Sequence, residues 1–293
     1  MKRTSTLRSS NLQSSKLTRR LFMVAFSVFA TSVTLHGCAG SQPTASSETE
    51  AASETIRVGV SPVPHAEILE FVKDNLAADA GLAIEIVEFS DYVQPNLALN
   101  DGQIDANYFQ HVPYMEDFGQ ERGIDMVAVV PVHIEPLGLY SRRIQSLDQV
   151  SDGATIAIPN DATNLGRALN LIADQGLITL RSGAGISATV QDIEDNPKDL
   201  NFVELEAAQL PRSLDDADLA IINGNYAIQI GLTPSQDALA LETADDNPYA
   251  NVLSVLRGQE DNPNVRTLAE LLDSPEVEEF IERTYDGSVI PAS

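Results

Sequence analysis

The sequence is poor in cysteine, tryptophan and basic residues. Its 293 residues include one Cys, no Trp and 18 Lys plus Arg, against 43 Asp plus Glu. A single Cys cannot form an intramolecular disulfide. The net charge of −25 argues against nucleic-acid binding, which depends on Lys and Arg at phosphates. We therefore expect neither a disulfide framework nor a nucleic-acid partner.

Familiar catalytic motifs are missing as well. The sequence contains no G-x-S-x-G, G-x-x-x-x-G-K-[ST], G-x-G-x-x-G or H-E-x-x-H pattern, which rules out the common hydrolase, nucleotide-binding and zinc-protease signatures. His65, His111 and His133 could close a zinc site together with a carboxylate, but they do not stand at helix-turn spacing. We expect no enzyme, no cofactor and no resident metal, and keep a metal-capture protein that uses these three histidines as an alternative.

The basic residues are concentrated at the N-terminus. Residues 1–37 hold six of the 18 bases and no acid, so the remaining 256 residues carry twelve bases against 43 acids, a net charge of −31. The basic stretch precedes an apolar run, Leu21–Leu35, which at 15 residues is short for a bilayer-spanning helix of about 20. This arrangement is typical of an export signal peptide. The strongly acidic remainder predicts a protein adapted to high salt, where repulsion between acids is screened.

The only cysteine follows this run directly. Leu35-His36-Gly37-Cys38 resembles the bacterial lipobox, which implies cleavage before Cys38 and lipid modification of its thiol. Thr18–Phe22 also resembles a twin-arginine export signal, so the export route stays open. Residues 39–54 are rich in Ser, Thr, Ala and Glu and cannot build a core. We expect a signal peptide over residues 1–37 and a lipidated tether over residues 38–54.

From Thr55 onward, apolar strands alternate with amphipathic helices. Helical periodicity is clear over His65–Ala80 and Asn164–Gln175, and short apolar runs joined by helices indicate an α/β fold with largely parallel sheets. The predicted strands are Ile56–Val60, Leu82–Phe89, Met126–Val132, Leu137–Tyr140, Thr155–Ile158, Phe202–Leu205, Leu219–Ile222 and Val252–Leu256.

So long an α/β region suggests two lobes. We expect lobe 1 over residues 55–140, lobe 2 over residues 141–245, and a return to lobe 1 with C-terminal helices over residues 246–293. Ligands of such folds bind at the carboxyl ends of strands and between domains.

Three blocks near predicted strand ends are unusually polar. They are Asp91–Asn96 with Gly102–Tyr114, Ile156–Leu169, and Ala220–Ala227. In this order, behind a lipobox, they resemble the NlpA family of MetQ-like methionine-binding lipoproteins that serve ABC importers, over a region from about Ile56 to the C-terminus. The resemblance implies a type II periplasmic-binding-protein fold, two α/β lobes with a ligand cleft between them.

The same resemblance implies the function and its setting. It predicts a monomeric, non-catalytic solute-binding protein that captures a free amino acid, most often methionine, and delivers it to the permease and ATPase of an ABC importer. The lipid anchor would hold it on the cell membrane, facing the periplasm or the cell exterior. Because family members also bind other ligands, another small amino acid or a peptide remains an alternative.

The family's binding residues fall on eight positions of this sequence. An aromatic cage falls on Tyr92, Phe109, His111 and Tyr114. The carboxylate anchor falls on Arg167 with Asn164 nearby, the amide beside the amine falls on Asn223, and Asn225 follows it as a further candidate. These residue types suit methionine, since sulfur packs well against aromatic rings and Arg forks onto a carboxylate.

Overall fold

The computed structural model describes residues 55–244 and 247–292. The expected signal peptide (1–37), the lipidated Cys38 and the tether (38–54) lie outside these residues. Within the described part of the chain, no helix combines the length and the apolar character needed to cross a bilayer.

The larger of two main sheets has six strands in the order β13-β4-β12-β3-β1-β2. Strand β1 runs parallel to β2 and β3, whereas β12 is antiparallel to β3 and β4, and β13 is antiparallel to β4. These strands are β1 (Thr55–Val60), β2 (Ala83–Glu88), β3 (Ala106–His111), β4 (Met126–Ile134), β12 (Ala250–Leu256) and β13 (Ile290–Pro291).

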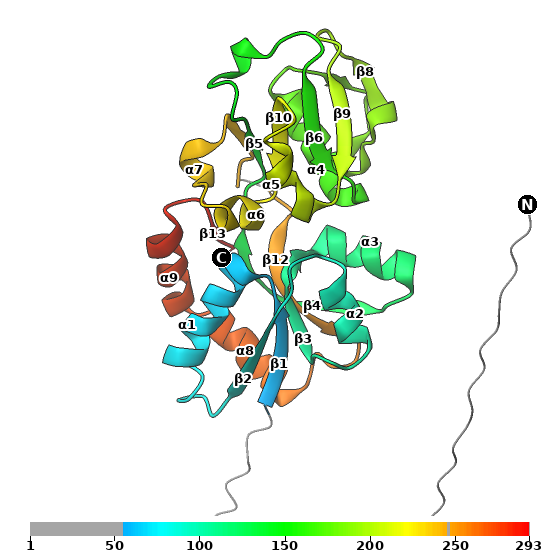
Figure 1. Ribbon diagram of the computed structural model, residues 1–293. Helices are drawn as coiled ribbons and strands as arrows, with labels where there is room; N and C mark the ends of the chain where they lie inside the picture. Colours follow the sequence, from blue (N-terminus) through cyan, green and yellow to red (C-terminus); the bar gives the residue numbers. More distant parts are fainter. Residues whose placement is uncertain (1–54, 245–246, 293) are drawn as a thin grey trace, which may run out of the picture. The chain divides into compact units, whose positions relative to one another are not determined.

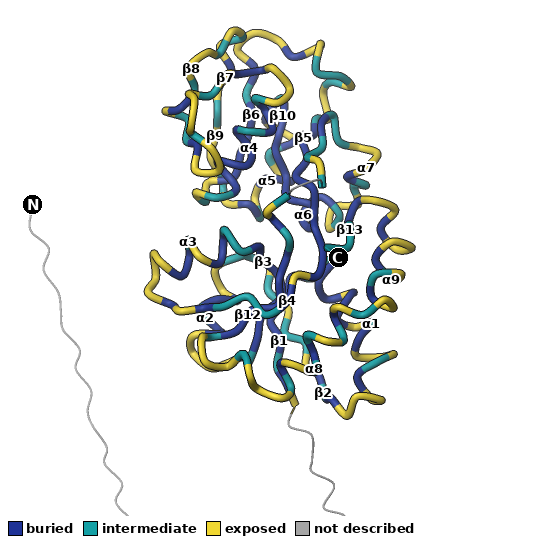
Figure 2. The backbone as a smooth tube through the Cα atoms, turned by 180° about the vertical axis from the view of Figure 1, so that it is seen from behind, coloured by how far each residue is buried: buried dark blue, intermediate teal, exposed yellow. Residues whose placement is uncertain are grey.

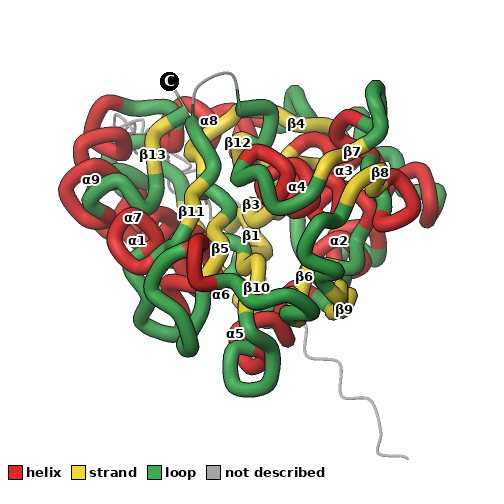
Figure 3. The backbone as a smooth tube through the Cα atoms, turned by 90° about the horizontal axis from the view of Figure 1, so that it is seen from above, coloured by secondary structure: helices red, strands yellow, loops and turns green. Residues whose placement is uncertain are grey.

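Helices cover both faces of this sheet (Figure 3). Apolar side chains of α1 (Glu67–Asn75), α8 (Pro263–Leu272) and α9 (Pro275–Tyr285) join one buried cluster with strand residues such as Val58 and Tyr108. Side chains of α2 (Gln94–Asn100) and α3 (Val112–Arg122) join another with Phe109. Successive strand residues point to opposite faces, so β3 contributes Tyr108 to one core and Phe109 to the other.

The second main sheet has five strands in the order β11-β5-β10-β6-β9. Strand β6 runs parallel to β10 and β9, and β5 is antiparallel to β10 and β11. The second sheet and its neighbours comprise β5 (Gly138–Tyr140), β6 (Thr155–Pro159), α4 (Ala162–Asp174), β9 (Asn201–Leu205), α5 (Leu210–Ser213), β10 (Leu219–Ile222), α6 (Gly224–Gln229), α7 (Pro234–Asp237) and β11 (Ala240–Leu241), with a hairpin of β7 (Thr179–Leu180) and β8 (Ile193–Asp195). The central strands of both main sheets are buried (Figure 2).

The chain passes between the two sheets twice, from β4 to β5 and from β11 to β12 (Figure 1). We use lobe 1 for the six-stranded sheet with α1, α2, α3, α8 and α9, and lobe 2 for the five-stranded sheet with α4 and α5. The first passage, residues 135–137, lies earlier than expected, because Gly138–Tyr140 pairs with β10 in the second sheet. Lobe 1 therefore ends before Gly138, and the expected end at residue 140 is wrong because it includes β5.

Two details of the predicted fold need correction. The sheets are mixed rather than largely parallel, because the passages between sheets bring β5 and β12 in against the direction of their neighbours. The first helix ends at Asn75 rather than Ala80, since Leu76 leaves helical geometry and the following turn runs to Gly81, a glycine with a φ of +67°.

Strand β3 is absent from the predicted set. Its sequence, ANYFQH, is fully buried yet half polar, so it shows no alternation of apolar and polar residues. The amides of Asn96, Asn107 and Gln110 bond to one another at 2.8–3.0 Å, and Ser254 donates to Asn107 Oδ1 at 2.6 Å. Buried amides are tolerated when they satisfy each other, and this network places β3 in the middle of lobe 1.

Candidate functional site

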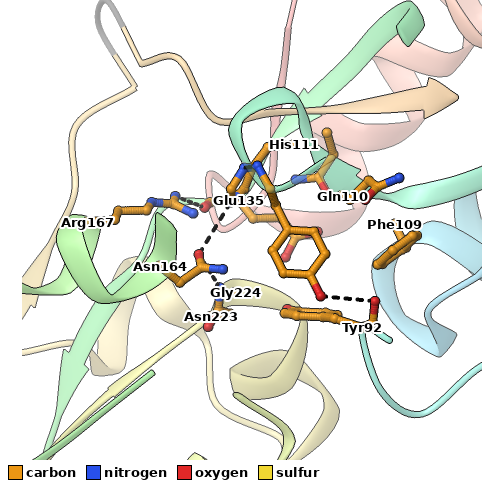
Figure 4. Close-up of a pocket in the computed structure, with 11 residues that line it drawn as sticks. Tyr92, Phe109, Gln110, His111, Glu135, Asn164, Arg167, Asn223 and Gly224 are labelled. Carbon is orange, nitrogen blue, oxygen red and sulfur yellow. Dashed lines mark hydrogen bonds between the residues drawn. The ribbon is translucent and has the colours of Figure 1, made fainter. Parts of the chain in front are cut away.

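A cavity lies between the two lobes (Figure 4). Its empty volume is about 340 Å³ when the open mouth is included. Lobe 1 and the segment before α2 supply Tyr92, Phe109, Gln110, His111, Tyr114 and Asn251, lobe 2 and the β10–α6 junction supply Asn164, Arg167, Asn223 and Gly224, and the first passage supplies Glu135. Seven of the eight predicted ligand-binding residues line this cavity, and Asn225 does not.

The four predicted cage residues form one aromatic wall. The ring centroids of Tyr92, Phe109 and Tyr114 lie 5.8–6.3 Å apart, and that of His111 lies 6.3 Å from Tyr114. These spacings are typical of favourable aromatic pairs. The hydroxyls are engaged elsewhere, since Tyr114 donates to the Tyr92 carbonyl at 3.1 Å and Tyr92 donates to Asn225 Oδ1 at 2.6 Å. Ring surface, and not hydroxyl groups, is therefore what this wall offers to the cavity.

His111 joins the aromatic wall to lobe 2. It caps the N-terminus of α3, because its Nδ1 accepts the backbone N–H of Tyr114 at 3.1 Å. This bond leaves Nε2 as the protonated ring nitrogen, which donates to Asn164 Oδ1 at 3.3 Å. Burial and the charge of Arg167 lower the pKa of His111 to about 3, so the ring is neutral at physiological pH.

Arg167 lies in α4, which begins at Ala162 after the N-cap Asp161, two residues before the expected start at Asn164. Its guanidinium is 4% exposed and is already held on one edge. Nε donates to both carboxylate oxygens of Glu242 at 2.9 and 3.0 Å, and Nη2 donates to Glu242 and to the carbonyl oxygen of Glu135. The Tyr249 ring lies 4.3 Å from the guanidinium carbon. Nη1 takes part in none of these bonds and is the guanidinium nitrogen that remains available to a ligand.

The side-chain amide of Asn223 is only half paired within the described part of the chain. Its Nδ2 donates to Asn164 Oδ1 at 3.0 Å, and Asn164 is fixed in turn by bonds to the Asp161 carboxylate at 3.0 and 3.1 Å. Asn223 Oδ1 is buried and has no hydrogen-bond partner among the residues that the structure describes. A buried acceptor without a donor is costly, so a donor from a ligand is expected there.

Asn225 supports the cavity from behind. Its side chain accepts the Tyr92 hydroxyl, and its backbone N–H donates to Glu135 Oε2 at 2.6 Å. The predicted contact of Asn225 with the ligand therefore has no counterpart on the cavity wall. The residue instead ties the α6 segment to the aromatic wall and to Glu135.

Four wall residues, Gln110, Glu135, Gly224 and Asn251, are missing from the predicted site. Gln110 and Asn251 stand on strands whose polar residues carry no helical or strand signal. Glu135 follows a buried strand directly, a position where an acid is unusual, and this is the signal that could have indicated it. Gly224 is required there, because a Cβ atom on it would lie 2.8 Å from the Cβ of Glu135.

The three histidines of the alternative metal site do not come together. His111 bonds to Asn164, whereas His65 and His133 lie in lobe 1 with ring centroids 4.9 Å apart. Their neighbour is Glu135, whose Oε1 is 3.3 Å from His65 Nε2 and 2.9 Å from His133 Nε2. The proposed set of His65, His111 and His133 is therefore wrong, and the carboxylate of Glu135 replaces His111 in the cluster.

Comparison with known proteins agrees with this architecture. A family model described as NlpA lipoprotein matches residues 56–293. The D-methionine-binding lipoprotein MetQ of Escherichia coli strain K12 is 44% identical over 237 residues, which cover 80% of this chain and 87% of that protein.

Solved structures show the same likeness. A nutrient-binding protein from Burkholderia cenocepacia, bound to methionine, is 44% identical with a TM-score of 0.78, over 81% of this chain and all of the other. A periplasmic substrate-binding protein of an ABC transporter from Coxiella burnetii is 44% identical with a TM-score of 0.77 over the same shares. The fold is the type II periplasmic-binding-protein fold, as expected. The chain belongs to the NlpA lipoprotein family.

Proposed function

We propose that the protein is a lipid-anchored solute-binding protein that captures free methionine between its two lobes and delivers it to an ABC importer. The observation that carries this proposal is the division of the cavity wall. One side is aromatic, and the other presents a guanidinium corner, an unpartnered amide oxygen and a carboxylate. A zwitterion with an apolar, polarisable side chain fits both sides at once.

The aromatic wall suits the thioether. Contact between sulfur and aromatic rings contributes about 0.3–1.5 kcal/mol, and burial of the side chain contributes about 1.5–3 kcal/mol. A micromolar dissociation constant corresponds to about 8 kcal/mol. The side chain alone is therefore insufficient, and the charged ends of the ligand must supply the rest.

The polar wall suits those charged ends. Nη1 of Arg167 can donate to the ligand carboxylate, in an end-on contact rather than the two-pronged fork expected from the sequence, because Glu242 holds the Nε edge. The ammonium can donate to the buried Asn223 Oδ1 and to the carboxylate of Glu135, both on the same wall. These contacts are charge-assisted and strong.

Because both lobes contribute to the cavity wall, movement of the lobes can capture and release the ligand. Tyr92 bonds to Asn225 at 2.6 Å and His111 bonds to Asn164 at 3.3 Å, so the closed arrangement has its own contacts across the cavity. Hinge opening between the lobes would break these contacts and expose the ligand. The described parts of the two passages, residues 135–137, 242–244 and 247–249, are the places where the hinge would bend.

The setting follows from the family. NlpA lipoproteins are solute-binding proteins of ABC transporters, and the protein is not an enzyme. We further propose a lipid anchor at Cys38 that faces the periplasm or the cell exterior, a monomeric state, and a permease with its ATPase as partners. A second ligand class, another small amino acid or peptide, is less well served by an aromatic wall of this size.

Mass spectrometry of the ligand tests the proposal directly. Freshly purified protein is denatured, and the released small molecules are identified and quantified against the protein. We expect methionine in near-stoichiometric amount. A different amino acid or a peptide as the main species would contradict the assignment of methionine, and a released metal ion in equal amount would contradict the amino-acid class.

A further inference from the structure

A buried cluster of three titratable side chains borders the ligand cavity without being explained by it. His65, carried by the short helical turn η1 (Pro62–Ala66), and His133 on β4 are 1% and 0% exposed. Neither lines the cavity, whereas Glu135 does. Both Nε2 atoms converge on the same carboxylate oxygen, at 3.3 and 2.9 Å. The histidines therefore touch the ligand site through Glu135, and His65 also reaches it through Asn251, whose Oδ1 lies 3.1 Å from His65 Nε2.

Neutral groups bond to the cluster, and His65 Nδ1 is buried without a hydrogen-bond partner among the described residues. The Tyr108 hydroxyl bonds to His133 Nδ1, Asn251 Oδ1 lies 3.1 Å from His65 Nε2, and the Asn225 N–H donates to Glu135 Oε2. The titratable and charged groups that face it from the surrounding elements are Tyr108 of β3, Tyr226 of α6, Tyr92 before α2, Tyr285 of α9 and Arg167 of α4. Arg167 is the only cation in this set.

That cation is shared with another carboxylate. The guanidinium of Arg167 pairs with Glu242, and it reaches Glu135 through the backbone carbonyl rather than the carboxylate, although its charge still favours an ionised Glu135. An ionised Glu135 would thus be a buried anion without a cation of its own, which is unfavourable. Burial accordingly raises the pKa of Glu135, and it lowers the pKa of His65 to about 4 and of His133 to about 3.

We propose that His65 and His133 are positioning residues of the ligand site that act through Glu135, and that the three side chains together hold one proton, which leaves the protein when an ammonium-bearing ligand enters the cavity. The proton belongs to the cluster rather than to one residue, as in other strongly coupled pairs. This inference rests on the proposed function, because it needs the ligand's ammonium beside Glu135.

Charge balance gives the direction of the exchange. In the free protein, the cluster with its proton is neutral. In the complex, the ligand ammonium supplies the positive charge next to an ionised Glu135, and the displaced proton goes to the solvent. One positive charge replaces another beside Glu135, so the immediate surroundings of this carboxylate stay neutral in both states. The negative charge of the ligand carboxylate is placed separately, next to Arg167. The Tyr108 hydroxyl donates to His133 Nδ1, which leaves the proton of the neutral ring on Nε2. This Nε2–H then donates to the ionised carboxylate of Glu135.

The sign of the pH effect follows by linkage. Because binding releases a proton, affinity rises with pH, by up to about tenfold per pH unit, as long as the free cluster is protonated. The rise ends where pH exceeds the raised pKa of the free cluster. Removal of the Tyr108 hydroxyl takes a donor away from His133 Nδ1 and makes that nitrogen easier to protonate. Tyr108→Phe is therefore expected to extend the rise to higher pH.

Calorimetry measures affinity and proton release in the same titration. Ligand-stripped full-length protein, refolded after dialysis in denaturant, is titrated with methionine in buffers of different ionisation enthalpy between about pH 5 and 8. We expect about one proton released per methionine at the lower pH values and none with Glu135→Gln. Glu279→Gln is the matched control, a neutralised carboxylate on α9 that is 77% exposed and pairs with Arg283, and it should keep both the proton count and the affinity of the parent.

The outcomes separate the two proposals. Absence of methionine binding at every pH contradicts the proposed function. Tight binding with no proton exchange, or with the same proton release in Glu135→Gln as in the parent, overturns this inference alone. An unshifted pH profile in Tyr108→Phe contradicts the positioning role of His133. A stoichiometric metal ion lost on His133→Gln substitution would also overturn it, because the cluster would then be a metal site.

Discussion

The two walls of the cavity are built on different principles. On the aromatic wall of lobe 1, Tyr92, Phe109 and Tyr114 pack against one another, and both hydroxyls are bonded within the protein. On the polar wall of lobe 2, Arg167 keeps one free corner and Asn223 an unpartnered oxygen. The first wall is complete in itself, whereas the second is complete only with a ligand. Substitutions on the first should therefore cost stability as well as affinity, and substitutions on the second mainly affinity.

The largest effect is expected on the aromatic wall. Phe109→Ala removes a ring that is 3% exposed and belongs to the core beneath α2 and α3. We expect the free energy of unfolding to fall by about 3–5 kcal/mol and methionine affinity to fall with it, as measured by urea denaturation and calorimetry. Val203→Ala, at a position 42% exposed, is the control and should change stability little. A Phe109→Ala protein of unchanged stability would show that the wall is not part of the core.

The next effect is expected on the polar wall. Arg167→Ala alone would leave the partly buried Glu242 without its cationic partner, so the informative variant combines Arg167→Ala with Glu242→Gln. We expect methionine affinity to fall by roughly 2–5 kcal/mol while the unfolding midpoint changes far less than in Phe109→Ala. The exposed Arg266→Ala, whose side chain is 63% exposed, should bind like the parent. Unchanged affinity in the double variant would remove Arg167 from the site.

A smaller effect separates two neighbouring amides. Asn223→Ala removes the unpartnered oxygen, and affinity should fall by about 1–2 kcal/mol. Asn225→Ala removes the acceptor of the Tyr92 hydroxyl, so we expect a loss of stability of similar size with a weaker effect on affinity. Calorimetry and urea denaturation of both variants give the four values needed. If Asn225→Ala lost the more affinity of the two, the assignment of Asn225 to a supporting position would be wrong.

The smallest effect concerns the acidic surface that surrounds both walls. The residues after position 37 carry a net charge of −31, and screening of their mutual repulsion should raise the melting temperature by a few degrees between low and about molar salt. Differential scanning fluorimetry in sodium chloride measures this shift. A melting temperature that stays constant or falls with salt contradicts adaptation of the surface to a saline environment.

The sequence was most informative where local patterns repeat. The run Ile56–Val60 and the helix predicted over Asn164–Gln175 are visible from apolar spacing, and the structure confirms both to within two residues, as Thr55–Val60 and Ala162–Asp174. Strand β3 was missed because its buried polar residues include amides, and part of their bonding comes from Ser254, which only the pairing with β12 brings beside them. No local signal can indicate a network whose members lie more than 140 residues apart.

The same limit applies to the site. Arg167 and Asn223 could be expected from the polar blocks around them, but the partner that takes one edge of Arg167 could not. Glu242 lies 75 residues away, on the return passage between the sheets. Glu135 and its two histidines likewise meet only because η1, β4 and the first passage pack together. Single residues were predictable there, and their pairing was not.

Titration of the ligand-stripped protein with methionine tests the central claim most directly. The two-walled cavity predicts saturable binding of one methionine per protein, with a dissociation constant in the micromolar range or tighter. It also predicts a clear loss when the ligand carboxylate is amidated, because Nη1 of Arg167 then meets a neutral group instead of a carboxylate. Absence of heat with methionine, or equal binding of the amide, would contradict a site that closes its polar wall on a zwitterion.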